Sequence, residues 1–292
     1  MKKKLLGIVK RTLSIYTNKH ISIYAGNATL FVLTAIFPLI VLVIAIVNLI
    51  PGYSPDDFAE LFFRFLPDVE ELRTVTARIF NTLKNQSSGA LAGVAALTTI
   101  WASSSGVSAI QKGLQRIFPG AIKDIKDRPL AVLYTLVFII LLPLTTIFQT
   151  AGDLIIKAVN NLSEKLGLAQ VNSILSSIIE LSHIINLILS VFMVLLIYRY
   201  LPRGRRSFKS QLPGAIFTGL SWMAFKEIFS FAIPRFWIAS SIYGSLAVLF
   251  LGILWLHILM SLLFLGACLN VAIRLENESR HEGGISKNQN KT

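Results

Sequence analysis

The last hydrophobic stretch of the chain, from Leu246 to Ala272, carries no formal charge at neutral pH when His257 is counted as neutral. A helix that crosses the hydrocarbon core of a bilayer needs about 20 apolar residues, and this stretch is longer than that. A soluble protein has no comparable way to bury every face of such a segment. The stretch therefore predicts a membrane-spanning helix, and it limits the rest of the chain to folds that a bilayer allows.

Five more hydrophobic runs precede it, so we predict an all-α polytopic membrane protein with six transmembrane helices. The composition agrees, because 54% of the residues are hydrophobic and 15% are charged, whereas soluble domains carry about 25% charged residues. We expect the membrane domain to cover residues 24–274, with spans at about 25–50, 89–110, 130–148, 181–198, 212–233 and 243–273.

Less hydrophobic segments lie between these spans and after them. Residues 53–88 and 149–180 carry apolar side chains at helical spacing, for example Phe58 and Phe62. They predict amphipathic helices on the outer side of the bundle. The tail 275–292 is polar and rich in glycine and asparagine, so we expect it to be disordered and cytoplasmic.

The distribution of charge predicts the orientation. The formal net charge is +13, and twenty of the 28 basic residues fall on the side of the N-terminus, seven on the opposite side, and Lys226 within a span. Cytoplasmic loops of membrane proteins carry an excess of Lys and Arg, so this bias places both termini in the cytoplasm of a multi-pass plasma-membrane protein. The bias also explains the net charge, so no nucleic-acid partner is expected.

The N-terminal segment, residues 1–23, predicts an amphipathic helix on the cytoplasmic side. Leu5, Val9 and Leu13 fall near helical spacing, with lysines around them. Such a helix can lie on the membrane surface with its lysines toward anionic lipid. The alternative is a positive flank that only fixes the orientation of the first span.

Four passages form a pattern when they are read in order. They are AGNATLFVLTAIFPL at Ala25–Leu39, WASSSGVSAIQKGLQRIF from Trp101, the YRYLP–basic loop–LPGA passage at Tyr198–Ala215, and IYGSLAVLFLGILWLHILMSLLFLGACLN ending at Asn270. Together they resemble the YihY / virulence factor BrkB family of bacterial inner-membrane proteins, formerly labelled ribonuclease BN. The resemblance implies a six-helix protein of the bacterial cytoplasmic membrane with a transport or envelope role, and it supplies no established catalytic residue.

One position departs from that family. The resemblance implies an acid within a Gly-Ala-Glu-Leu-Asn pattern, but here Gly266 and Ala267 are followed by Cys268. A mechanism that uses a carboxylate at this position is therefore not expected in this chain. Cys268 is also the single cysteine of the sequence, which excludes an internal disulfide and a metal site made of cysteines alone.

The sequence does not predict an enzyme. It contains no HExxH, GxSxG or P-loop motif, and its four histidines are scattered at positions 20, 183, 257 and 281. Those motifs place a metal, a nucleophile or a phosphate against the groups that act on it. We therefore expect no catalytic residues, no metal and no cofactor.

Polar side chains within the predicted spans are the candidates for a substrate or coupling site, because charges and hydrogen-bonding groups at membrane depth are costly. They are Ser103, Ser104, Ser105, Lys226, Glu227 and Asn270. Each has a structural alternative. The serines can hydrogen-bond within their own helix, and Lys226 can extend to the membrane interface.

A second group of candidates lies in the basic loop after the fourth span. Arg203, Arg205 and Arg206 have no acid among them, so they predict a contact with anionic lipid. Topological anchoring is the alternative.

Together these features favour transport or translocation of a small or lipid-like anion. The alternative is a non-enzymatic membrane protein that acts in envelope assembly by binding partners. The bilayer is the expected partner, and a homo-oligomer is compatible with the sequence.

Overall fold

The computed structural model describes residues 2–47, 89–118, 187–202, 206–236 and 245–289, together with a few isolated positions. Five helices account for most of these residues: α1 (Lys2–Asn18), α2 (Ile21–Val47), α5 (Gly89–Ile117), α8 (Phe208–Phe236) and α10 (Ser245–Gln289). A further helix covers Leu187–Tyr200. The described residues include no strand, which confirms the all-α prediction for this part of the chain.

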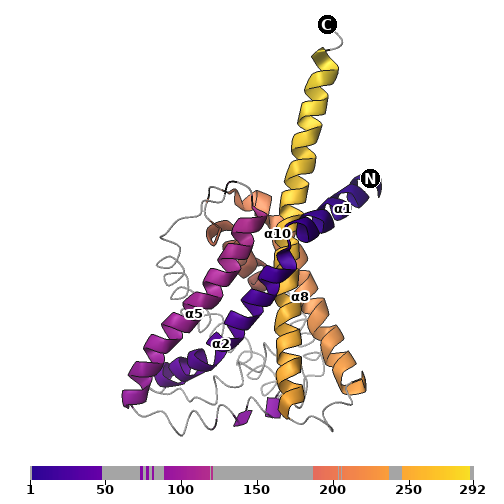
Figure 1. Ribbon diagram of the computed structural model, residues 1–292. Coiled ribbons are helices and arrows are strands. Elements are labelled where there is room, and N and C mark those ends of the chain that lie inside the picture. The colour runs from indigo at the N-terminus through magenta and orange to yellow at the C-terminus, as the bar shows by residue number, and fades with distance from the viewer. Residues whose placement is uncertain are drawn as a thin grey trace, which may run out of the picture.

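Helix α10 is the central element, because it contacts α1, α2, α5 and α8. Figure 1 shows α2 beside α5 and α8 beside α10, and the two pairs come together at the end of the bundle that carries α1. The last hydrophobic stretch of the sequence therefore lies within the helix around which the others pack.

Two helices are long and apolar enough to cross a membrane, Phe208–Ile233 and Leu249–Ser279, and shorter apolar helices cover Ile21–Ile36 and Leu187–Tyr200. They fall on four of the six predicted spans. Helix α5 covers a fifth but is rich in small and polar residues, and it is not among these apolar helices of the described chain. The sixth span, 130–148, and the amphipathic segment 149–180 lie outside the described residues, as does nearly all of 53–88. The six-span arrangement therefore stays a prediction.

The predicted N-terminal segment is divided by a sharp turn. His20 has a φ of 54°, the left-handed conformation that residues other than glycine adopt rarely. Its backbone N–H donates to the carbonyl of Thr17 at 3.0 Å, which closes the turn between α1 and α2. Because of this turn, α1 points away from the direction of α2 and lies across the end of the bundle (Figure 1).

The tail 275–292 was expected to be disordered, whereas α10 continues through it as far as Gln289. Leu275 and Glu276 are good helix formers, and extending a helix that already exists has no nucleation cost. Arg274 and Glu278 also form an i,i+4 ion pair at 3.4 Å. The 45 residues of α10 give a length of about 68 Å, roughly twice the hydrocarbon core of a bilayer.

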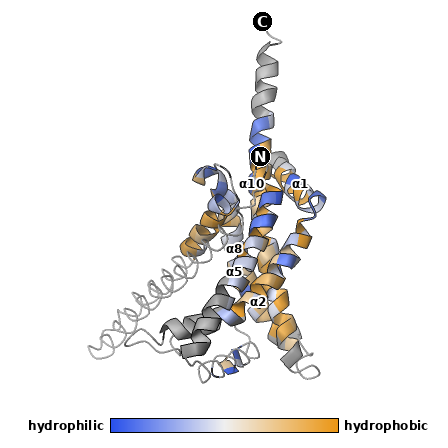
Figure 2. Ribbon diagram, turned by 60° about the vertical axis from the view of Figure 1, so that its left-hand side comes forward, coloured by the Kyte–Doolittle hydropathy of each residue, from blue (hydrophilic) through white to orange (hydrophobic). Residues whose placement is uncertain are grey.

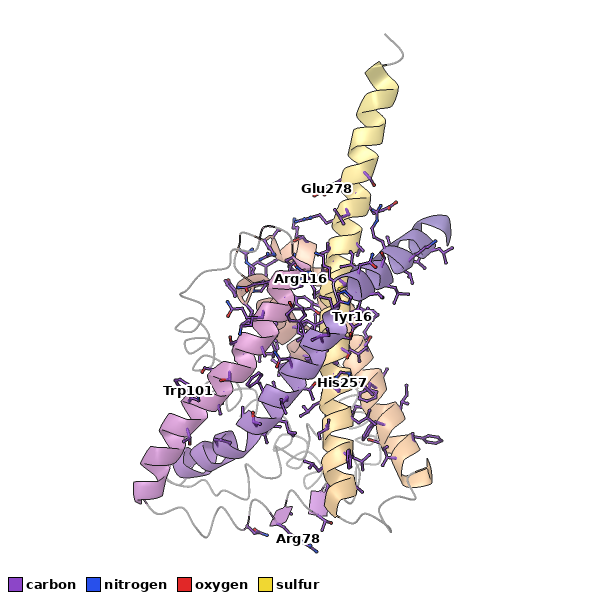
Figure 3. The ribbon with its side chains drawn as sticks, in the orientation of Figure 1. Tyr16, Arg78, Trp101, Arg116, His257 and Glu278 are labelled. Carbon is purple, nitrogen blue, oxygen red and sulfur yellow. The ribbon has the colours of Figure 1, made fainter. Side chains whose placement is uncertain are left out.

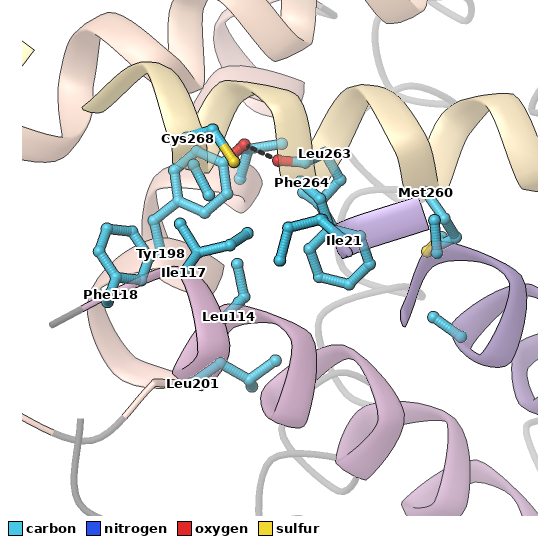
Figure 4. Packing of buried hydrophobic residues seen from close by; sticks show 14 of the residues in the cluster. Ile21, Leu114, Ile117, Phe118, Tyr198, Leu201, Met260, Leu263, Phe264 and Cys268 are labelled. Carbon is cyan, nitrogen blue, oxygen red and sulfur yellow. Dashed lines mark hydrogen bonds between the residues drawn. The ribbon is translucent and has the colours of Figure 1, made fainter. Parts of the chain in front are cut away.

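The hydrophobic core lies where α5, α10 and the helix Leu187–Tyr200 meet the start of α2 (Figure 4). Its largest fully buried side chains include Ile21, Leu114, Tyr198 and Phe264. One stripe of apolar side chains on α8 faces outward instead. Figure 2 shows hydrophobic residues along α2, while hydrophilic ones gather near α1 and the adjoining part of α10. The exposed stripe on α8 includes Leu212, Ile216, Leu220 and Met223, as expected for a helix in lipid.

Candidate functional site

A seam of hydrogen bonds joins α8 to α10. The Asn270 Oδ1 atom accepts from the backbone N–H of Gly214 at 2.7 Å, and its Nδ2 atom donates to the carbonyl and the Oε1 atom of Gln211 at 3.1 and 3.2 Å. Asn270 is buried, and both ends of its amide are used. This candidate therefore acts at least as an interhelical clamp.

The seam continues to the helix Leu187–Tyr200. The buried Tyr198 hydroxyl donates to the carbonyl of Leu263 at 2.5 Å (Figure 4). It also lies 2.8 Å from the hydroxyl of Thr218. The helices approach closely here because Gly214 and Gly266 face each other. A Cβ atom on Gly266 would collide with Thr218 and would lie 2.6 Å from the Tyr198 hydroxyl, so this packing requires small residues.

Guanidinium groups stack on aromatic rings at the end of the seam. The Arg206 guanidinium lies 4.5 Å from the ring centre of Phe118, and its Nη1 atom donates to the carbonyl of Pro202. Burial, and after it the charge of Arg274, lowers the pKa of Arg206. Arg199 lies 4.4 Å from the ring centre of Phe208. Arg203 and Arg205, predicted beside Arg206, lie outside the described residues.

A further cation lies at the same end of the bundle. The Lys19 Nζ atom donates to the carbonyl of Ile117, the last residue of α5, at 2.8 Å. A cation at this position stabilises the negative end of a helix. Burial lowers the pKa of Lys19, Cys268 acts in the opposite direction, and Arg116 lowers it further. Figure 3 shows Arg116 at this end of α5.

The three predicted serines differ in their bonding. The hydroxyls of Ser104 and Ser105 donate to the carbonyl of Trp101 at 2.8 and 3.1 Å, which is the bond within the helix that was the alternative to a cavity. The Ser103 hydroxyl is buried and has no hydrogen-bond partner. Trp101 itself points away from the bundle (Figure 3).

The most unusual polar group was not predicted. Gln111 is 1% exposed, and neither its Nε2 nor its Oε1 atom has a hydrogen-bond partner. An unsatisfied buried polar group costs about 1–3 kcal/mol. Gln111, Gln115 and Phe118 follow at i, i+4 and i+7, so they lie on one face of α5, and Phe118 contacts both Tyr198 and Arg206.

Lys226 and Glu227 are not part of this assembly. Glu227 is exposed on α8 and Lys226 is partly buried, and they lie about 12 Å along the helix from Thr218. The structure thus places Asn270 in the contact between α8 and α10 and Arg206 against Phe118, and it leaves the predicted pair apart from both. In the described ranges, no three residues of the types His, Cys, Asp and Glu are grouped as a metal site requires.

The comparisons with known proteins agree with a membrane protein. A family model described as "Virulence factor BrkB" matches residues 12–290. The ribonuclease-like protein YfkH of Bacillus subtilis (strain 168) is 24% identical over 283 residues, which are 92% of this chain and 95% of YfkH. The UPF0761 membrane protein PSHAa0171 of Pseudoalteromonas translucida (strain TAC 125) is 25% identical over 266 residues, 88% of this chain and 82% of that protein. No solved structure matches the chain.

Proposed function

The chain belongs to the virulence factor BrkB family of membrane proteins, and from this premise we propose that it translocates a small or lipid-like anion. The observation that carries the proposal is the unpaired, buried amide of Gln111. It lies about 10 Å along α5 from Phe118, the ring on which Arg206 is stacked.

The chemistry of these groups suits an oxyanion. A guanidinium presents several N–H donors in a plane and binds phosphate or carboxylate through two bonds at once. Arg206 has the charge of Arg274 near it, and an anion would relieve the repulsion between them. The Gln111 amide then offers a neutral donor and acceptor further into the membrane.

The face of α5 below Phe118 provides a polar line for such a substrate. Ser104, Ser108, Gln111 and Gln115 follow at i, i+4, i+7 and i+11, so they lie within about 60° of one another around the helix and extend over roughly 16 Å. None of them carries a charge, so they can hydrogen-bond a headgroup without holding it too tightly to release.

The test is a flux or lipid-scrambling assay with the purified protein in liposomes. We expect Gln111→Leu to lower the rate by roughly ten- to a hundredfold, the loss expected for one buried hydrogen bond to a charged group. Lys112→Gln, an exposed neighbour on the same helix, is the matched control and should keep the rate. An unchanged rate with Gln111→Leu, in protein inserted at normal levels, would contradict the proposal.

Lys226→Met and Glu227→Gln form a second arm of the same assay. If these residues act on the substrate or on a coupled proton, both variants reach the membrane and lose flux. Normal flux from both variants would leave Lys226 as a residue that extends to the interface.

A second candidate function is envelope assembly through partner binding, and the length of α10 favours it. The helix continues to Gln289, far beyond the bundle that it holds together (Figure 1). Removing residues 280–292 should leave flux unchanged under the first proposal and should release a co-purifying partner under the second. Neither proposal includes a catalytic step, since the ribonuclease-like name belongs to a relative at 24% identity.

A further inference from the structure

Helix α1 has three distinct faces. One face packs on the bundle through Thr12, Ile15 and Tyr16, of which Thr12 is buried and the other two contact the core. The Arg11 guanidinium adds an ion pair with Glu276 of α10 at 3.4 Å. This face fixes the rotation of α1 about its own axis, so the directions of its other side chains are determined.

The second face is apolar and exposed. Leu5 is 68% exposed, Leu6 73%, Val9 49% and Leu13 53%. At about 100° per residue these four side chains fall within an arc of about 100°. Four large apolar residues on one face of a short helix form a patch that a soluble surface rarely presents.

The third face is basic and polar. Lys10 and Ser14 are exposed on it, and Lys2, Lys3 and Lys4 precede the apolar residues, while α1 contains no acid. A helix with one apolar face and lysines beside it has the composition of a helix that lies in the interface of a membrane containing anionic lipid.

We infer that the apolar face of α1 (Leu5, Leu6, Val9 and Leu13) docks on the anionic surface of the bilayer in which the protein is embedded. The turn at His20 leads directly into the apolar helix α2, so α1 is tethered beside the membrane at high effective concentration. A second copy of the chain is a poorer occupant, because pairing two such helices would bring their lysines together.

The experiment uses the full chain reconstituted in lipid vesicles. Two variants, Val9→Cys and Ser14→Cys, each carry an environment-sensitive fluorophore on the introduced cysteine. Each variant is prepared in a Cys268→Ala background and also with the buried native Cys268. Quenching is measured with nitroxide-labelled lipid and with aqueous iodide, in vesicles of phosphatidylcholine alone and of phosphatidylcholine mixed with phosphatidylglycerol.

In the mixed vesicles we expect lipid nitroxide to quench the Val9 label and iodide to quench the Ser14 label. Replacing Lys2, Lys3 and Lys4 by Gln should shift the Val9 label toward iodide, with about a fivefold loss of partitioning for each lysine. Equal access of iodide to both labels in the mixed vesicles would overturn the inference. Shielding of Val9 that disappears when the protein is diluted in lipid would also overturn it, because a second copy would then cover the face.

Discussion

Two buried side-chain amides of the bundle differ in their hydrogen bonding. Asn270 uses its carbonyl and its amino group in bonds to α8, whereas the amide of Gln111 has no partner. Removing one partner of a buried hydrogen bond leaves the other group desolvated and unpaired, which lowers the free energy of unfolding. Removing a buried group that has no partner leaves no such group behind. Asn270 therefore contributes to the free energy of unfolding, and Gln111 reduces it.

We predict that Asn270→Leu lowers the free energy of unfolding by about 1–3 kcal/mol, because the Gly214 N–H and the Gln211 carbonyl lose their partner. Gln111→Leu should leave it unchanged or raise it. Thermal unfolding of both variants in the same detergent is the measurement. Comparable destabilisation by the two substitutions would show that Gln111 has a bonding role in the fold.

Two glycines of α10 differ in the space around them. A Cβ atom on Gly266 would lie 2.7 Å from the carbonyl of Gly214 and would also collide with Thr218, whereas one on Gly252 would meet nothing within 4 Å. At Gly266 the space for a Cβ atom is occupied by a neighbouring backbone, which a change of rotamer cannot move. At Gly252 the space is open, so only the helix propensity of the new residue changes the free energy of unfolding.

Gly266→Ala should therefore lower the free energy of unfolding by about 1–3 kcal/mol, as overpacking does. Gly252→Ala should raise it by up to about 1 kcal/mol, because alanine is the better helix former. The pair is compared by thermal unfolding at equal detergent concentration. If Gly266→Ala is as stable as Gly252→Ala, α8 and α10 do not approach as closely as described.

At the scale of the elements, the hydrophobicity of the sequence predicts where helices lie, but it does not predict which helices pack against each other. The predicted spans 181–198, 212–233 and 243–273 overlap helices of the structure because length and apolar composition are local properties. The bond between Tyr198 and Leu263 joins residues 65 positions apart, and a single sequence does not reveal which faces meet. Gln111 was not among the candidates because it follows the end of the predicted span 89–110. The helical continuation of the tail was not predicted because the composition there is polar and rich in glycine and asparagine.

The terminal part of α10 should be separable from the bundle. Leu275 and Glu276 are the last residues of this helix that are described in contact with the bundle, and removing residues 280–292 leaves both in place. We predict an unchanged thermal midpoint and a loss of helical signal in circular dichroism. Truncation after Leu275 removes Glu276, the partner of Arg11, and should lower the midpoint. Equal midpoints for the two truncations would mean that the ion pair does not hold α1.

For the whole molecule, residues from four separate segments meet at one end of the bundle. Lys19 bonds to the last carbonyl of α5, Arg206 stacks on Phe118 just beyond it, and Arg11 pairs with Glu276 of α10. The charge distribution predicts that all of these segments lie on the cytoplasmic side. Six spans would bring them to the same side of the bilayer, and this topology stays a prediction.

Cysteine labelling in intact cells tests this topology. Single cysteines at Asn85 and Gly167, in a Cys268→Ala background, should react with an impermeant thiol reagent, because the charge count places both residues outside. Gly204 is a poor site for the cytoplasmic control, since its φ of 127° disfavours any side chain. The exposed Ser207 of the same loop is the better position, and Ser207→Cys should react only after the cells are permeabilised. Labelling of Ser207→Cys alone in intact cells would reverse the orientation, and labelling of all three would contradict six spans.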